Sequence, residues 1–189
     1  MNDRLDKALE LLGRVVTAMA KRPDELDLAV ERTAGTCEVT ITANPADTKR
    51  LVGRQRETLR QLETLFRMLA HGSCVKVGLC YLIPNSNPEP PFAPFVARPD
   101  WPRFMVENLL KDVTEAVFEL PAVMRTEVKN LYSVKMYATV QGDLSNSQLL
   151  GLYDKTVNGL WTVVGTNCGM KVYAHAEDWY KAAGPVASR

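Results

Sequence analysis

Histidine is scarce in this chain, and its cysteines are not paired. There are two histidines, His71 and His175, and four cysteines without a CxxC motif. A structural zinc site is therefore not expected, because such sites take closely spaced Cys and His ligands. The cysteines lie in strand-like segments, which predicts buried, reduced thiols and a cytosolic compartment.

Catalytic fingerprints are also lacking. The sequence contains no GxSxG, P-loop or Rossmann motif, and the segment from Gly165 to Gly169 matches none of them. Each histidine lies beside the end of a predicted strand, where a hydrogen-bonded structural role is the ordinary expectation. We therefore expect a protein that is not an enzyme and that takes no cofactor and no metal.

A strong net charge is missing too. The net charge is +1, from 23 Lys and Arg against 22 Asp and Glu, which excludes binding to nucleic acid by bulk charge alone. Residues 1–82 hold 13 basic and 11 acidic side chains, and the remainder holds 10 and 11. A nucleic-acid footprint is thus expected to be local and to lie in the first half. The sequence has neither a signal peptide nor an apolar run of membrane-spanning length, which predicts a cytoplasmic protein with no membrane partner.

The chain does contain an internal repeat. Apolar positions in residues 11–23 recur 98 residues later, and the segment 51–59 recurs at 149–157. Two copies of one fold, each of roughly ninety residues, are therefore expected. We place the first copy at residues 1–83, a Pro-rich linker at 84–102, the second copy at 103–180 and a flexible tail at 181–189.

Hydrophobic periodicity predicts the same order of elements in both copies. The predicted class is α+β, with a three-stranded sheet covered by helices in each copy (α-β-β-α-α-β). The elements expected in the first copy are a helix at 4–21, strands at 26–32 and 37–43, a helix at 45–52, a helix ending at 71 and a strand at 74–83. Those expected in the second copy are a helix at 103–119, strands at 125–130 and 133–140, helices at 145–150 and 155–166, and a strand at 170–176.

Basic residues gather around Gly53, which separates the two helices predicted in the middle of the first copy. Glycine lets another backbone approach closely, and the N–H groups at the start of the following helix favour an anion. Arginine adds a planar donor suited to phosphate. The cations are Lys49, Arg50, Arg54, Arg56 and Arg60, with Glu57 as the single anion among them. They also fit the alternative of a solvated face on two surface helices.

The order of elements and the segment from Asp47 to Arg60 (DTKRLVGRQRETLR) resemble a type II KH domain, and most closely the small stand-alone bacterial KH proteins. The resemblance covers about residues 4–83 and extends more weakly to 103–176. It implies a GxxG loop that meets the backbone of about four unpaired nucleotides. Gly53 then corresponds to the first motif glycine, and Arg54 and Gln55 to the variable positions. Arg56 departs from the motif, because it stands where the second glycine belongs.

The resemblance also implies a groove beside the loop that accepts unstacked bases. We expect its apolar floor to include Leu51, Val52 and Val39. Few phosphates would be neutralised, so affinity should be modest and sensitive to salt.

The second copy retains Gly151 but has lost the basic loop. Leu152, Tyr153 and Asp154 replace the Arg-Gln-Arg of the first copy, and Lys155 is the one cation nearby. Phosphate binding is not expected there. Tyr153 has two interpretations, stacking on a base or packing locally. We expect this copy to serve in packing, in contact with a partner, or in lengthening the groove.

Trp161 occupies the position of Glu63 in the repeat alignment. An exposed indole there would mark an interface, either between the two copies or with another chain. The alternative is that the helix is rotated and buries the ring.

Together these features predict a tandem KH-like protein that binds single-stranded RNA, such as mRNA, with low sequence specificity and a post-transcriptional role. Two alternatives remain: a KH-like scaffold or adaptor that binds proteins or itself through the second copy, and a single-stranded DNA-binding protein. The size and the paired architecture also resemble the KH-type RNA-binding proteins of large nucleus-forming bacteriophages, which would imply a bacterial host cytoplasm.

Overall fold

The computed structural model describes residues 3–33, 36–71, 74–81, 103–130, 133–142, 147–164 and 168–173. The predicted linker at 84–102 and the predicted tail at 181–189 lie outside these ranges. Within the described ranges, no helix has the length and the apolar character needed to cross a membrane.

The first copy folds as a helix, two strands, two helices and a third strand, which confirms an α+β composition. Strand β2 lies in the middle of the sheet; β1 pairs with it antiparallel and β3 parallel. Short 3-10 turns precede β1 and α3. The elements are α1 (Asp3–Met19), β1 (Asp27–Thr33), β2 (Thr36–Ala43), α2 (Pro45–Val52), α3 (Glu57–Leu69) and β3 (Cys74–Tyr81).

The described part of the second copy has the same sheet order but one helix fewer than the first copy. Its elements are α4 (Arg103–Phe118), β4 (Ala122–Asn130), β5 (Ser133–Val140), α5 (Ser147–Val164) and β6 (Cys168–Tyr173). The predicted break at Gly151 is wrong, because α5 runs through this residue without interruption. A glycine inside a helix costs only about 1 kcal/mol. Burial of the apolar face of α5, which includes Val157, Leu160 and Trp161, outweighs that cost.

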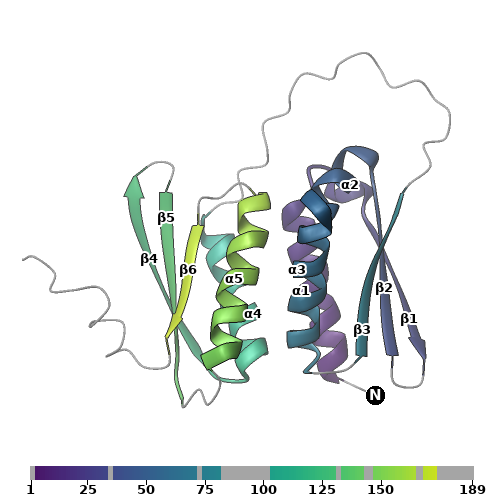
Figure 1. The fold of residues 1–189 in the computed structure, drawn as a ribbon. Helices are drawn as coiled ribbons and strands as arrows, with labels where there is room; N and C mark the ends of the chain where they lie inside the picture. The colour runs from purple at the N-terminus through teal and green to yellow at the C-terminus, as the bar shows by residue number, and fades with distance from the viewer. Residues whose placement is uncertain are drawn as a thin grey trace, which may run out of the picture.

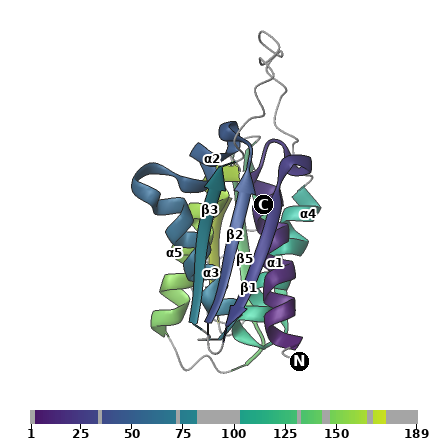
Figure 2. The same ribbon diagram turned by 90° about the vertical axis from the view of Figure 1, so that its right-hand side faces the viewer.

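The two copies pack back to back through their helices. In Figure 1 the layers follow one another in the order first sheet, helices α1 and α3, helices α4 and α5, second sheet. Figure 2 shows the first sheet face on. Buried side chains from both copies form one continuous apolar cluster, to which Leu12, Phe66, Leu109 and Leu160 contribute. The copies therefore share a core.

The helix pairs meet with local two-fold symmetry. The start of α1 lies against the end of α4, so these helices are antiparallel, and α3 and α5 meet in the same way. Residues at the axis of an isologous contact touch their own equivalents. Arg14 accordingly donates a hydrogen bond at 2.7 Å to Asp112, its partner 98 positions later. Gln61 lies against Gly159, which is also 98 positions away.

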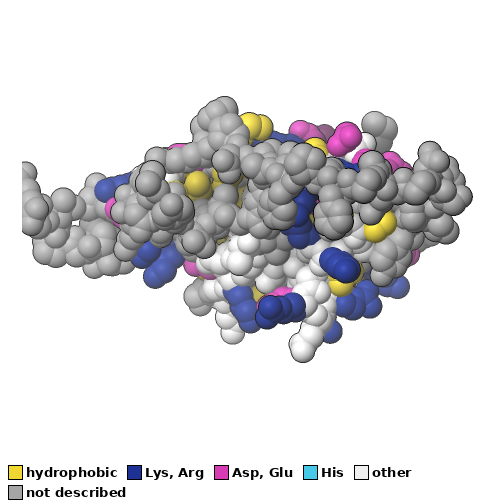
Figure 3. Space-filling view, turned by 90° about the horizontal axis from the view of Figure 1, so that it is seen from above, with side chains coloured by type: hydrophobic (Ala, Val, Ile, Leu, Met, Phe, Trp, Pro, Cys, Tyr) yellow, Lys and Arg dark blue, Asp and Glu magenta, His cyan; other side chains and the backbone are white. Residues whose placement is uncertain are grey.

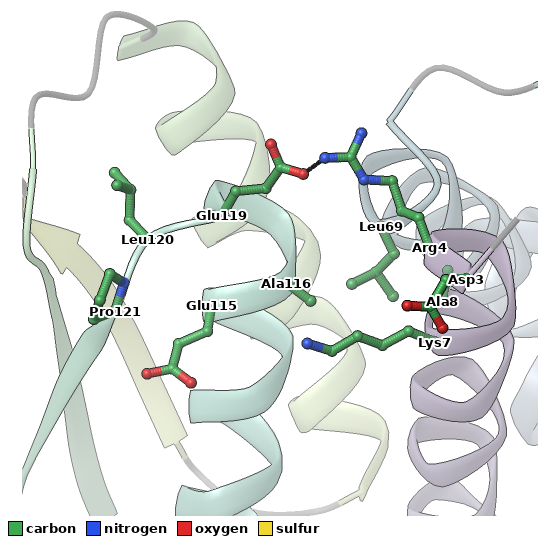
Figure 4. A pocket seen from close by; sticks show the side chains of 10 residues that line it. All are labelled: Asp3, Arg4, Lys7, Ala8, Leu69, Glu115, Ala116, Glu119, Leu120 and Pro121. Carbon is green, nitrogen blue, oxygen red and sulfur yellow. Dashed lines mark ion pairs between the residues drawn. The ribbon is translucent and has the colours of Figure 1, made fainter.

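An ion pair bridges the two copies at one end of this helical interface. A hollow of about 560 Å³ lies between the start of α1 and the end of α4, and Figure 4 shows Arg4 reaching across it to pair with Glu119. The Nε2 atom of His71 contacts the Ala116 carbonyl oxygen at 3.0 Å. Acidic and basic side chains alternate here, so this hollow has no dominant charge. It serves the contact between the copies.

Candidate nucleic-acid interface

Helix α2 is fixed at its start by Asn44. The Asn44 side chain accepts a hydrogen bond at 2.8 Å from the backbone N–H of Ala46 and donates one to Glu25. Pro45 takes the first helical position, where no N–H is needed. Asparagine before proline is therefore a cap that both starts α2 and ties it to the segment before β1.

Asp47 anchors α2 to the end of α1. Its carboxylate is fully buried and accepts hydrogen bonds at 2.9 Å from the backbone N–H groups of Lys21 and Arg22. No local pattern singles out Asp47, because its partners lie 26 and 25 positions away. This contact holds the chain after α1 beside the basic helix α2.

Replacing Asp47 by alanine is expected to lower the free energy of unfolding by about 3 kcal/mol, because two N–H donors lose a charged acceptor. Urea unfolding followed by circular dichroism measures the change. The control is Asp24→Ala, which removes an exposed carboxylate from the neighbouring turn and should have little effect. Equal stability of the two variants would contradict the anchoring role.

The loop after α2 is a tight turn made largely of left-handed backbone. Gly53 has φ +70°, Gln55 +51° and Arg56 +62°. A Cβ atom on Gly53 would lie 2.1 Å from Oγ1 and 2.8 Å from the backbone nitrogen of Thr58, so only glycine fits. The turn is short enough for α3 to begin directly at Glu57.

The loop points its charged side chains into solvent. Arg54, Gln55 and Arg56 are all exposed. Arg56 precedes α3 without capping it through a side-chain hydrogen bond. The positive end of the α3 helix dipole therefore lies beside the guanidinium groups of Arg54 and Arg56. This combination favours the binding of an anion.

Predicted cations from α2 and the loop line a common hollow of about 820 Å³. Lys49, Arg50 and Arg54 lie on one side of it, and the polar side chains of α3 and α5 on the other. Lys21 joins them from the end of α1, although sequence analysis did not include it. No local motif marks Lys21, because the Asp47 contact brings it there. Figure 3 looks onto this end of the molecule, where Lys and Arg side chains gather.

A second hollow, of about 410 Å³, lies on the other side of Glu57 and Gln61. Gln55 and Arg60 line it from the first copy, and Lys155 lines it from α5. In the second copy, Lys155 lies inside α5 and not beside a loop. Antiparallel packing of α3 and α5 instead brings Lys155 to the site of the first copy.

The predicted apolar floor is largely wrong. Leu51 and Val39 are completely buried in the core, so bases cannot reach them, and Val52 is half-buried. The surfaces beside the loop are lined mainly by polar and charged side chains. The described site is thus suited to a phosphate backbone more than to apolar base faces.

In the second copy, the described positions that align with the loop lie inside α5. Tyr153 is fully buried, shares a hydrogen bond of 2.9 Å with Thr114 and meets Phe118 edge to face, with ring centroids 5.3 Å apart. Stacking of Tyr153 on a base is therefore excluded, and local packing is correct. Gly151 lies in the helix, and burial raises the pKa of Asp154 to about 6.

Trp161 is 2% exposed and belongs to the core shared by the two copies. The interpretation that the ring is buried is therefore correct. Trp161 therefore offers no exposed indole to another chain. Self-association through this residue loses the sequence feature that had favoured it.

No protein-family model matches this chain, and no curated protein matches it significantly. Any function must therefore be argued from the residues and their arrangement.

Proposed function

We propose that this chain is a KH-like protein that binds single-stranded RNA, with the phosphates held at loop 53–56. The observation that carries the proposal is a glycine loop between two helices, surrounded by cations from the loop itself, from α2, α3 and α5, and from the segment after α1. The order α-β-β-α-α-β of the first copy, with Gly53 between α2 and α3, supports the KH-like assignment. Because the described part of the second copy forms no such loop, we propose one loop site of this kind per chain.

The electrostatics of the site favour a polyanion. Among the described residues that line the two hollows, Glu57 is the single acidic side chain, against six basic ones. The basic side chains are Lys21, Lys49, Arg50, Arg54, Arg60 and Lys155. With a net charge of only +1, this concentration of positive charge is local. Local charge steers an anionic strand to one place on the surface.

The two hollows suit an unpaired strand that bends around the loop. They lie on either side of Gln61 and meet at Glu57, next to the loop itself. A backbone that passes from one hollow to the other would place successive phosphates near Arg54 and Arg60. The charged side chains along this path are mostly cations suited to phosphate, and phosphate contacts carry no sequence information, so we propose low sequence specificity and a post-transcriptional role on many transcripts.

Affinity for single-stranded RNA is expected to fall about 50-fold when salt rises from about 50 to 200 mM. The estimate takes about four neutralised phosphates and the slope for single strands. Fluorescence anisotropy of a labelled unstructured oligonucleotide measures it. Competition with DNA of the same sequence is the second arm, and preference for DNA would assign the site to single-stranded DNA. Affinity independent of salt would contradict the phosphate cradle.

A further inference from the structure

The outer face of the second sheet is aromatic and basic. Side chains alternate along each strand, so one set from β4, β5 and β6 points away from the helices. Val123, Arg125 and Lys171 of this set are exposed, and Val123 is 53% exposed. The described members of the set are Val123, Arg125, Glu127, Lys135, Tyr137, Thr139, Lys171 and Tyr173.

Two tyrosines lie at the centre of this face. Register places Tyr137 opposite Arg125 on one neighbouring strand and opposite Lys171 on the other. Tyr173 lies next to Tyr137, with ring centroids 6.3 Å apart and ring planes tilted by 31°. The Tyr137 hydroxyl donates to Glu127 at 3.4 Å, which helps hold its ring in place. Burial raises the pKa of both tyrosines, so the rings are uncharged at neutral pH.

The first sheet provides an internal comparison, because it has the same topology and its outer face has the opposite character. Thr40 occupies the central position that Tyr137 holds in the second sheet, with Ala29 and Gly78 opposite it. Its outward charged side chains are Asp27, Glu31, Glu38 and Lys76. The outer face of the first sheet is therefore acidic and lacks aromatic rings among its described side chains. The repeat has diverged on this surface, and the fold does not require the aromatic and basic set.

We infer that the outer face of the second sheet is a separate binding surface for an unpaired RNA strand. Bases stack on Tyr137 and Tyr173, and phosphates meet the flanking Arg125, Lys135 and Lys171. Aromatic side chains offer stacking to any base, and nearby cations follow the backbone. Glu127 is the one carboxylate among the described members of the set and pairs with Arg125 at 3.5 Å, so three cations against one anion leave an excess of positive charge that matches a polyanion. The surface is distinct from loop 53–56, and its binding does not depend on that loop.

The test is an NMR titration of the full chain in which Arg54→Asp and Arg56→Asp have removed the loop site. We expect this protein to bind an unstructured oligouridine of about eight nucleotides, with shifts centred on the amides of Tyr137 and Tyr173. Adding Tyr137→Leu and Tyr173→Leu should weaken this binding about tenfold or more, whereas Phe at both positions should preserve it.

A charge-matched pair completes the test. Lys171→Glu and Lys76→Glu change the net charge equally on the outer faces of the two sheets. We expect the first to weaken the residual binding and the second to leave it nearly unchanged. Absence of residual binding in the loop-reversed protein, or binding that survives the leucine variants, would overturn the inference. Failure of the loop proposal gives a different result, because RNA affinity would then fall with the sheet variants and not with the loop variants.

Discussion

Reversing the charge of both Arg54 and Arg56 to aspartate is expected to lower the affinity of the loop for single-stranded RNA at least about a hundredfold. The change turns two cations into two anions at the start of α3. Repulsion then replaces attraction where the phosphates would lie. Both side chains are exposed, so little packing is lost. Aspartate also tolerates the left-handed backbone of position 56 better than most residues, so the fold should remain intact.

A matched double variant separates the local effect from net charge. Lys7→Glu with Lys76→Glu changes the charge by the same amount on α1 and on β3, away from the loop. We expect it to alter affinity only slightly in anisotropy titrations at low salt. Thermal unfolding of both variants checks that each is folded. Equal losses of affinity from the two pairs would refute the loop as the phosphate site.

Alanine at Gly53 and alanine at Gly151 are expected to have effects of opposite sign, although the two glycines are equivalent in the repeat. Gly53→Ala should destabilise the protein by about 3 kcal/mol, because its backbone conformation is restricted to glycine and the new Cβ would overlap Thr58. Gly151→Ala should stabilise it by about 0.5–1 kcal/mol, because this residue is inside a helix with open space around it.

Urea unfolding of the two variants and the parent measures this difference. RNA affinity adds a second readout, since Gly53→Ala should weaken binding even where the variant is still folded. Comparable stability of the two variants would mean that the turn at Gly53 is not the constrained feature described above.

Much of the first copy could be predicted from its sequence, because its signals are local. Asn44 and Pro45 start a helix, Gly53 ends it, and apolar positions alternate along β2. These cues depend on residues a few positions apart. They were enough to place the loop and the cations around it.

The second copy could be predicted less well from its sequence. The repeat alignment predicted a helix break at Gly151 because Gly53 ends a helix in the first copy. One glycine, however, does not end a helix whose apolar face is buried. Whether Tyr153 and Trp161 are exposed depends on how α5 packs, and the linear pattern does not contain that information. Both are buried.

Groupings of residues that lie far apart in the sequence could not be predicted either. Lys21 reaches the site through Asp47, and Lys155 reaches it because α3 and α5 are antiparallel. The aromatic and basic face of the second sheet likewise depends on register, which places residues from three strands side by side. Such groupings are properties of tertiary structure.

The central claim is that RNA phosphates lie against loop 53–56, and NMR mapping on the unmodified chain tests it most directly. Titration with an unstructured single-stranded RNA should shift the backbone amides of residues 53–58 at low salt, and the shifts should diminish as salt is added. Saturable RNA binding that leaves these amides unchanged would contradict the account.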